Sequence, residues 1–461
     1  MTDHSFRSSL VVATLLGTIF ITSEASLYGQ YVLPDVAAQP MVSSDITSEI
    51  ETLYRRISDL ERKIAETQPE PIPPGEIELL PCVETEPPPC PFSKCVGYDN
   101  GFYARTCDMN YMLKIRGLIQ FRHYADWRNA TSGDDFESGF VVERAPIIFS
   151  GNFISPQLKY WYILQASRAT GTEFLEEGKL IYAFENGLQF QAGRFRDPAF
   201  LREMDISYAR QLAVERSYYN SVFATGVLEG ISLSKQNDWY RWIAYLNDGR
   251  NSGSSARSKD FFQDNADIAI SASTDIKFFG EWAQYGDFTS WPDEERAMFL
   301  KLAMFYENPE HGDTDPMNDQ AGLISYATEL TYESHGFAAF GSFVGRHSLV
   351  EGQDINQFGG LCQVSYQVIP DHWEPFMRYE YIWFDGFTDV GAGINPVNDS
   401  NLNIVAAGFN WYFHRQGFKF TIEAMHAFNE IPFSSPNTGF LADEAGESGQ
   451  TVLRSQIQLF F

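Results

Sequence analysis

The sequence has no hydrophobic run that is long enough for a transmembrane helix. Its longest apolar stretch, residues 10–21, spans 12 residues, whereas a helix needs about 20 to cross a bilayer. Arg7 precedes this stretch and the small-x-small triplet Ser23-Glu24-Ala25 follows it, which is the pattern of a secretory signal peptide. We therefore predict a signal peptide at residues 1–25 and an exported chain that is either soluble or a membrane β-barrel.

Basic residues are also scarce. The chain has 33 Lys and Arg against 61 Asp and Glu, with a formal net charge of −28. Nucleic-acid binding is excluded as a function class, because phosphate backbones require a basic footprint. The eight histidines are scattered, and neither a Gly-x-Ser-x-Gly motif nor a zinc-ligand spacing occurs. The sequence therefore predicts no catalytic residues, no metal site and no cofactor.

Cysteine is rare and unevenly distributed. Of the five cysteines, four lie within one proline-rich acidic segment, at Cys82, Cys90, Cys95 and Cys107. In an exported protein such a cluster favours two disulfides over a zinc site, since no histidine is interleaved. The spacing leaves all three pairings open. Cys362 remains, on an apolar strand face, as a buried or lipid-facing small residue.

The residues before this segment carry a heptad repeat. Isoleucine and leucine alternate at steps of four and three, at Ile46, Ile50, Leu53, Ile57, Leu60 and Ile64. This spacing predicts a coiled coil within residues 26–68, and its short length leaves a lone amphipathic surface helix as the alternative. Residues 69–110 then form a linker rich in proline and cysteine.

From residue 111 to residue 461 the pattern has period two. In "LKIRGLIQFRHY", residues 113–124, apolar residues alternate with Lys114, Arg116 and Arg122. Recurring segments of this kind, together with 15% aromatic residues, predict an all-β fold: a transmembrane antiparallel β-barrel of about 16 strands. The final "TVLRSQIQLFF" fits the strand that closes such a barrel. A secreted β-sandwich or propeller does not explain one oily and one charged face on nearly every strand.

One long segment interrupts the alternation. Residues 194–223 follow a strand yet show no period-two pattern, and five arginines (194, 196, 202, 210 and 216) outnumber the acidic residues between them. We expect this segment to fold into the barrel as a constriction loop. The alternative is a surface loop whose charges pair with one another.

The same segment carries a resemblance to a known family. "AGRFRDPAFLREMD" and "AVERSYYNS" resemble the loop motif of the phosphate-selective porin O and P family, and "FVVERAPIIFSGNF", "GFNWYFHRQGFKF" and "LRSQIQLFF" resemble its strands. The resemblance implies a porin of the bacterial outer membrane, in contact with its lipid, for passive diffusion of small anions such as phosphate. It also implies a homotrimer, although the heptad alone leans towards a dimer. Similar helices in other envelope porins tether the barrel, so we expect a periplasmic N-terminal segment that contacts the cell wall.

The predicted anion site follows from these residues. We expect Arg194, Arg196, Arg202 and Arg216 to form the constriction, and Lys114, Arg116, Arg122 and Arg144 to form a ladder leading to it. Lys159 and Arg241 fall on the same face, but so do Glu281, Glu329, Glu380 and Glu423. Where the family has two further cations beside Arg144, this chain has Glu143 and Pro146. A weakly selective general diffusion porin, or a structural barrel that anchors the coiled coil, therefore remains an alternative.

Overall fold

The computed structural model describes residues 55–56, 58–59, 62–63, 95–129, 135–166, 173–250, 266–309, 322–350, 353–384, 400–443 and 447–461. The chain divides into two compact units, residues 1–85 and 86–461. In the first unit the described residues are helical and exposed, with an ion pair between Arg62 and Asp59 at 2.9 Å. The predicted signal peptide and the apolar heptad positions lie outside the described residues.

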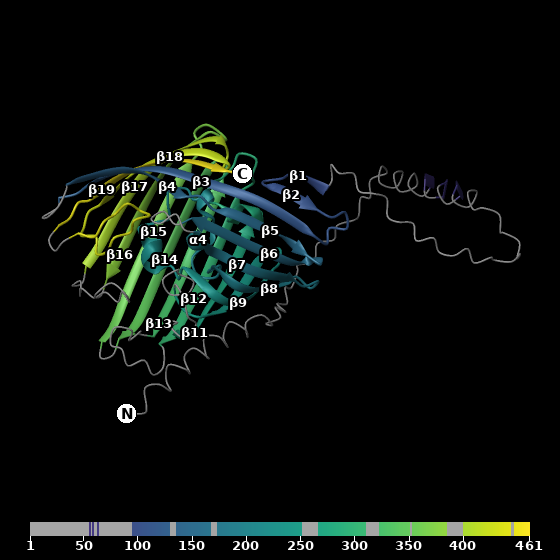
Figure 1. Ribbon diagram of the computed structural model, residues 1–461, viewed down its shortest axis with the longest axis horizontal. Coiled ribbons are helices and arrows are strands. Elements are labelled where there is room, and N and C mark those ends of the chain that lie inside the picture. The colour runs from purple at the N-terminus through teal and green to yellow at the C-terminus, as the bar shows by residue number, and fades with distance from the viewer. Residues whose placement is uncertain are drawn as a thin grey trace, which may run out of the picture. The chain divides into compact units, whose positions relative to one another are not determined.

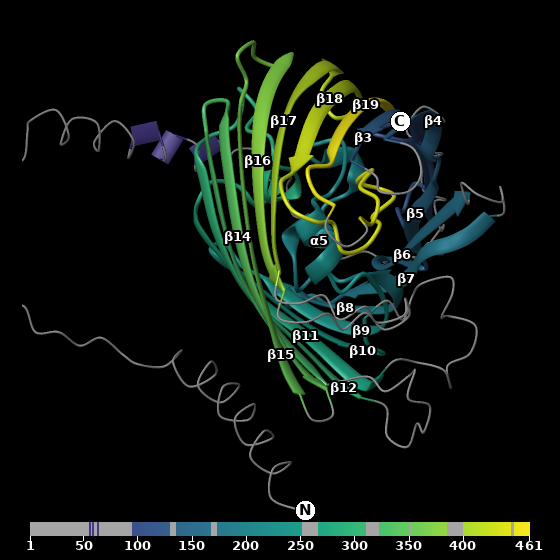
Figure 2. The ribbon, with the colours of Figure 1, turned by 90° about the vertical axis from the view of Figure 1, so that its left-hand side faces the viewer.

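The second unit is built from one antiparallel sheet, in which strands that follow one another in the chain pair with each other. The strands are β1 (Val96–Tyr98), β2 (Phe102–Arg105), β3 (Met112–Trp127), β4 (Phe136–Arg144), β5 (Ile147–Phe153), β6 (Ser155–Ala166), β7 (Glu173–Ala183), β8 (Leu188–Arg196), β9 (Val227–Gln236), β10 (Tyr240–Asn247), β11 (Ala266–Phe279), β12 (Ala297–Pro309), β13 (Leu323–Ser334), β14 (Phe337–Val350), β15 (Gln353–Tyr366), β16 (Trp373–Phe384), β17 (Ser400–His414), β18 (Phe418–Ala427) and β19 (Thr451–Phe460). Figures 1 and 2 show the sheet curling into a barrel.

Sixteen strands cross the barrel wall, as the sequence predicted. β4 and β5 pair with successive parts of β3, so the two together make one crossing. β1 and β2 form a hairpin that extends the sheet beside the first residues of β3, where Phe102 lies opposite Ile115. The ring closes where β19 pairs with β3, with Phe460 opposite Leu118.

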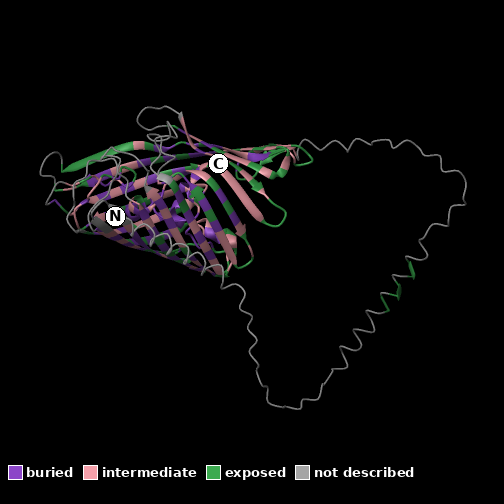
Figure 3. Cartoon of the chain, turned by 90° about the horizontal axis from the view of Figure 1, so that it is seen from below, coloured by how far each residue is buried: buried purple, intermediate pink, exposed green. Residues whose placement is uncertain are grey.

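Side-chain burial alternates along the strands as the period-two pattern predicted. On β3, Ile119 and Phe121 are exposed on the outer surface, while Gln120 and Arg122 point inward and are fully buried. Such alternation follows from the pleat of a strand, and an apolar outer face is what a lipid-facing barrel requires. Figure 3 shows the buried and exposed residues as alternating bands on the wall. No helix among the described residues is long and apolar enough to cross a membrane.

The two ends of the barrel differ. At one end, here called the turn end, connections such as residues 335–336 and 415–417 are short, and the chain finishes beside them. At the other, the loop end, connections such as 428–450 are long. One long connection, residues 280–296, belongs to the turn end, because it follows β11 and precedes β12.

Three of the long connections lie inside the barrel. They are residues 197–226, which we call the constriction loop, residues 280–296, and the described part of the connection 428–450, residues 428–443 and 447–450. Each carries side chains that are at most 5% exposed, among them Phe200, Trp291 and Phe440. Figure 2 shows α5 (Tyr218–Phe223) of the constriction loop within the ring of strands, next to the yellow segment that joins β18 to β19.

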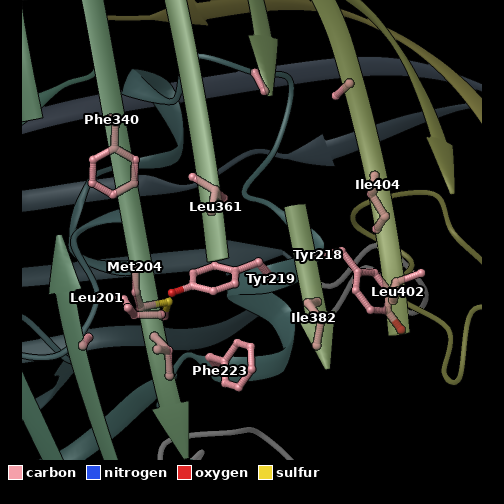
Figure 4. Close-up of a cluster of buried hydrophobic side chains, with 14 of the residues drawn as sticks. Leu201, Met204, Tyr218, Tyr219, Phe223, Phe340, Leu361, Ile382, Leu402 and Ile404 are labelled. Atoms are coloured by element: carbon pink, nitrogen blue, oxygen red, sulfur yellow. The ribbon is translucent and has the colours of Figure 1, made fainter. Parts of the chain in front are cut away.

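The apolar core of the molecule lies between the constriction loop and one side of the wall. The lumen face of β14 to β17 carries apolar side chains between its polar ones, and the loop packs its own apolar side chains against them. Figure 4 shows Leu201, Met204, Tyr218, Tyr219 and Phe223 of the loop facing Phe340, Leu361, Ile382, Leu402 and Ile404 of the strands. Because this contact excludes water, it stabilises the loop by the hydrophobic effect.

The closing seam of the barrel depends on a glycine. Gly117 and Phe461 exchange two backbone hydrogen bonds, of 2.7 and 2.9 Å, and a Cβ on Gly117 would lie 2.6 Å from Phe461 Cζ. We expect Gly117→Leu to destabilise the folded barrel by about 1–3 kcal/mol, the usual cost of overpacking. The urea midpoint and the heat-modifiable gel band measure this. Gly139→Leu is the matched control, since a Cβ there meets nothing within 4 Å, and equal loss in both variants would contradict the prediction.

The cysteines are described in part. Cys107 is disulfide-bonded. Cys95 has a free thiol whose sulfur lies 3.7 Å from that of Cys107. Cys82 and Cys90 lie outside the described residues, so two disulfides among these four remain a prediction. Cys362 is free and exposed on the outer face of β15.

Candidate functional site

One buried carboxylate holds both ends of the constriction loop. Asp197, which follows β8, is fully buried. It accepts hydrogen bonds from the Ala199 backbone N–H and from the Thr225 and Ser271 hydroxyls, at 2.6 to 2.8 Å. Thr225 lies at the far end of the loop and Ser271 lies on β11. One side chain therefore ties both ends of the loop to the wall.

The loop has short helical turns and otherwise little regular structure. α4 (Arg202–Asp205) and η1 (Tyr208–Arg210) each make about one turn, and Ser217 caps the N-terminus of α5, with its side chain accepting from Asn220 N. Most of the backbone carbonyls of such a segment have no helical partner and need donors from elsewhere.

Inward-facing side chains of the strands supply those donors. Each of six loop carbonyls accepts a hydrogen bond of 2.8 to 3.3 Å from a different strand side chain. The pairs are Pro198 with Lys301, Tyr208 with Gln120, Ala209 with Gln458, Gln211 with Lys419, Leu212 with Asn410, and Glu215 with Arg378. Many of the polar residues that alternate along the strands therefore bind the loop and do not line open water.

Glu215 is the centre of the buried charges that hold the loop. Its Oε2 lies 3.0 Å from Nη2 of Arg122 and 2.5 Å from Nη1 of Arg144, and all three residues are at least 91% buried. Burial alone would raise the pKa of the Glu215 carboxyl, but the two guanidinium groups outweigh burial and hold it well below its usual value. Glu215 is therefore ionised at neutral pH.

Two of the predicted constriction arginines hold the loop instead of lining a pore. Arg202 is 1% exposed and donates to the backbone carbonyls of Tyr285 and Asp287, in the connection 280–296, at 3.0 and 2.6 Å. Arg216 donates to the carbonyls of Glu203, Met204 and Ile206 within the loop itself, at 2.7 to 3.1 Å. Both guanidinium groups donate to backbone carbonyls. The sequence could not show these contacts.

Arg194 lies on the other side of the wall. It stands directly opposite Glu229 in the β8–β9 register, and its Nη1 is 3.5 Å from that carboxylate. Ile231 and Leu233, which are exposed on the outer surface, share the face of Glu229 because side chains alternate along a strand. Arg194 therefore does not belong to the constriction.

The predicted ladder is divided in the same way. Arg122 and Arg144 belong to the Glu215 cluster, and Lys114 pairs with Asp99 at 3.4 Å. Of the four, Arg116 alone lines the cavity described below. The acidic residues expected on the lumen face are similarly engaged. Glu329, Glu380 and Glu423 are at most 2% exposed, while Glu281 lies in the connection 280–296 and caps η3 (Trp282–Gly286).

A cavity of about 600 Å³ lies between the constriction loop and the walls formed by β3 and by β5 to β10. Trp161, Tyr208, Trp282 and Phe460 contribute aromatic surface. Among the described residues that line the cavity, cationic side chains outnumber carboxylates by six to two; the cations are Arg116, Lys179, Arg196, Arg210, Lys235 and Arg241, and the acids are Glu177 and Asp205. Lining residues near the β7–β8 and β9–β10 turns place its mouth at the turn end.

The charges of this cavity are only partly neutralised. Arg196 pairs with Glu177, and Arg241 pairs with Asp275 at 2.8 Å. Arg210 and Lys235 form no ion pair with any described residue. Arg210 is exposed, and it is the cation whose repulsion acts on Arg116. The cavity is therefore a positive region in a chain of net charge −28.

Tyr208 places the cations on the loop side of the cavity. The guanidinium carbons of Arg144, Arg196 and Arg216 lie 4.3, 5.0 and 4.9 Å from the centre of its ring. Cation–π contacts of this kind attract cations to the ring face. Tyr208 thus holds three arginines together in spite of their mutual repulsion, and one of them, Arg196, reaches the cavity.

Sequence reasoning identified Arg116, Arg196 and the inward position of Arg241, but it did not select Lys179, Arg210 or Lys235. The signal for Lys179 was present, because the alternation of β7 places it on the inward face. Lys235 shares the strand face of Ile231 and Leu233 on β9, so alternation gave no such signal, and it joins the lining next to the β9–β10 turn. Arg210 was counted in the arginine-rich segment, and its position gave no sign that it alone would be exposed there.

The fold is similar to those of solved outer-membrane structures. An anion-selective porin from Comamonas acidovorans aligns with a TM-score of 0.50 and 13% identity over 76% of this chain and 99% of that one. OmpF of Salmonella typhi, in complex with daunomycin, has a TM-score of 0.49 and 14% identity over 79% and 100%. The channel DcaP of Acinetobacter baumannii has 0.46 and 9% over 77% and 99%. At 13% identity, the likeness to the Comamonas acidovorans porin shows the porin-type barrel fold alone.

No family model matches the sequence, and the search of curated proteins gave no match. The finer resemblance to the phosphate-selective porins therefore remains a prediction.

Proposed function

We propose that this chain is a channel of the bacterial outer membrane for the passive diffusion of small anions, with phosphate as the solute that fits best. The cationic cavity at the turn end carries this proposal. A few uncompensated cations within a low-dielectric wall focus a positive potential, and there local charge outweighs the net charge of the chain. Guanidinium and ammonium groups also replace the hydration that an anion loses on entry.

The outward face supports the membrane location. Apolar and aromatic side chains are exposed along the strands, and exposed tryptophans, Trp127 at one end and Trp239, Trp373 and Trp411 at the other, stand near the strand ends. Aromatic residues at both edges of an apolar band are typical of barrels in a bilayer. The family resemblance supports a homotrimer, and the heptad supports a periplasmic helix that contacts the cell wall.

A weakly selective general diffusion porin is the second candidate. It is favoured by one observation: Arg194, Arg202 and Arg216 do not line the cavity, so fewer arginines face a solute than the sequence suggested. A barrel that serves only as an anchor is less well supported, because an anchor has no need for a cavity lined by six cations.

Reversal potentials in planar bilayers under a KCl gradient test the proposal. We expect anion preference for the wild type and a shift towards no preference for the triple variant Arg116→Gln, Lys179→Gln, Arg210→Gln, because half of the cations that line the cavity are removed. Arg105→Gln is the control, since Arg105 lies on β2 outside the barrel wall. Cation preference in the wild type, or an unchanged potential in the triple variant, would leave the general diffusion porin.

A further inference from the structure

A second group of polar side chains lies on the opposite side of the constriction loop, towards the loop end. Arg346, near the end of β14, points inward and is 6% exposed. Its Nε is buried without an acceptor, and it donates no hydrogen bond to any described residue. Its guanidinium carbon lies 5.0 Å from the centre of the Phe223 ring in α5.

An unpaired hydroxyl stands beside this arginine. Ser325 is directly opposite Arg346 in the β13–β14 register, is 1% exposed, and has a buried Oγ without a partner. Side chains at opposed positions of antiparallel strands have Cβ atoms about 5 Å apart. Two neighbouring strands therefore present unsatisfied donors at the same level of the lumen. Buried polar groups are nearly always paired, so such a pair of exceptions indicates a missing partner.

The charges around Arg346 indicate that the partner is negative. Glu307, a carboxylate whose charge acts on Arg346, already accepts from Arg250 N at 2.9 Å and from Arg250 Nε at 2.8 Å. The charge of Arg250 itself repels Arg346. Within the described residues Arg346 has no ion pair. A neutral partner would leave this positive charge uncompensated in a buried place.

We propose that Arg346 and Ser325 form an anion-binding site for a small oxyanion, phosphate or a carboxylate, on the loop-end side of the constriction loop. The planar guanidinium can donate two parallel hydrogen bonds to two oxygens of one oxyanion, and the Ser325 hydroxyl can donate a third. The site adds a binding step to the proposed channel. The biological role of the site rests on that proposed function. Its existence is independent of whether the cavity at the turn end sets selectivity.

Binding of inorganic phosphate to the purified full-length protein in detergent, followed by titration calorimetry, tests the site. We expect the wild type to bind phosphate saturably. Arg346→Gln should weaken this binding at least about tenfold, because a charge-assisted hydrogen-bonding partner is lost. Arg346→Lys should weaken it less, since the charge stays while the fork geometry is lost. Ser325→Ala should produce the smallest loss.

Two controls keep the result interpretable. Arg415→Gln removes an arginine that is exposed at the turn end and paired with Asp293 and Asp371, and it should leave the affinity unchanged. Heat-modifiable migration shows that each variant is folded; if Arg346→Gln fails to fold, Arg346→Lys and Ser325→Ala carry the test. Absence of saturable binding in the wild type, or equal affinity in the wild type and the folded Arg346 and Ser325 variants, would overturn the site.

The outcomes also separate this site from the proposed function. Anion-selective reversal potentials with no effect of the Arg346 and Ser325 variants on phosphate affinity would reject the site and leave the channel proposal standing. Weakened phosphate binding in Arg346→Gln, with a wild-type channel that prefers cations, would do the reverse.

Discussion

Replacing Glu215 by alanine is expected to destabilise the barrel by about 3–5 kcal/mol, the cost of leaving buried charges without their partner. The change removes the one carboxylate that lies within 3.0 Å of both Arg122 and Arg144. Repulsion between these arginines should then loosen the constriction loop, so we also expect a larger single-channel conductance. Urea unfolding in detergent and bilayer recordings measure the two effects.

The control for this variant is Glu185→Ala, because Glu185 is exposed in the turn between β7 and β8. Similar stability of Glu215→Ala and the wild type would show that the buried charges are not what holds the loop.

The contribution of Glu215 should also depend on pH. Its pKa in the folded protein lies well below the value of about 4.3 for an unfolded chain. A depressed pKa means that the stabilisation is complete above the unfolded value and is lost as the pH falls through the folded value. The difference in unfolding free energy between the wild type and Glu215→Ala should therefore stay constant from pH 7 to about 5 and shrink in stronger acid.

Replacing Arg202 by glutamine should lower stability without altering ion selectivity. Arg202 donates to Tyr285 O, Asp287 O and the Thr331 hydroxyl, and its loss leaves buried acceptors unsatisfied at a cost of about 3 kcal/mol. Because Arg202 does not line the cavity, the reversal potential should not move. Arg196→Gln should have the opposite profile, with a clear shift in reversal potential, since Arg196 lines the cavity. A change in ion selectivity in Arg202→Gln would contradict this prediction and would show that Arg202 acts on the solute in the pore.

The barrel could be predicted from the sequence because alternation is a local property. Ile119 and Phe121 are apolar, whereas Gln120 and Arg122 are polar, and only apolar side chains are stable against lipid. The pattern alone therefore predicts which face of β3 points outward. The break between β4 and β5 was harder to see. Pro146 has no backbone N–H to donate to the ladder, and it falls between the two strands.

The filling of the lumen could be predicted only in part. An arginine-rich segment without alternation indicated the constriction loop, but the connection 280–296 was not recognised, although Trp282, Tyr285, Phe288 and Trp291 give it more aromatic surface than a solvated turn needs. The role of each arginine could not be predicted from the sequence. Whether an arginine meets a carbonyl, as Arg202 does, or an open cavity, as Arg210 does, depends on contacts between residues far apart in the chain.

The hydrogen bonds of the constriction loop also have a mechanical consequence. The loop is bonded to β3 through Tyr208 O, to β12 through Pro198 O and to β17 and β18 through Leu212 O and Gln211 O. β17, β18 and β3 lie on one side of the ring and β12 lies on the other, so the loop links opposite sides of the barrel wall. A barrel wall without such cross-links can flatten under lateral pressure, whereas a wall whose opposite sides are linked keeps its cross-section. The dimensions of the lumen should therefore be insensitive to the tension and thickness of the surrounding bilayer.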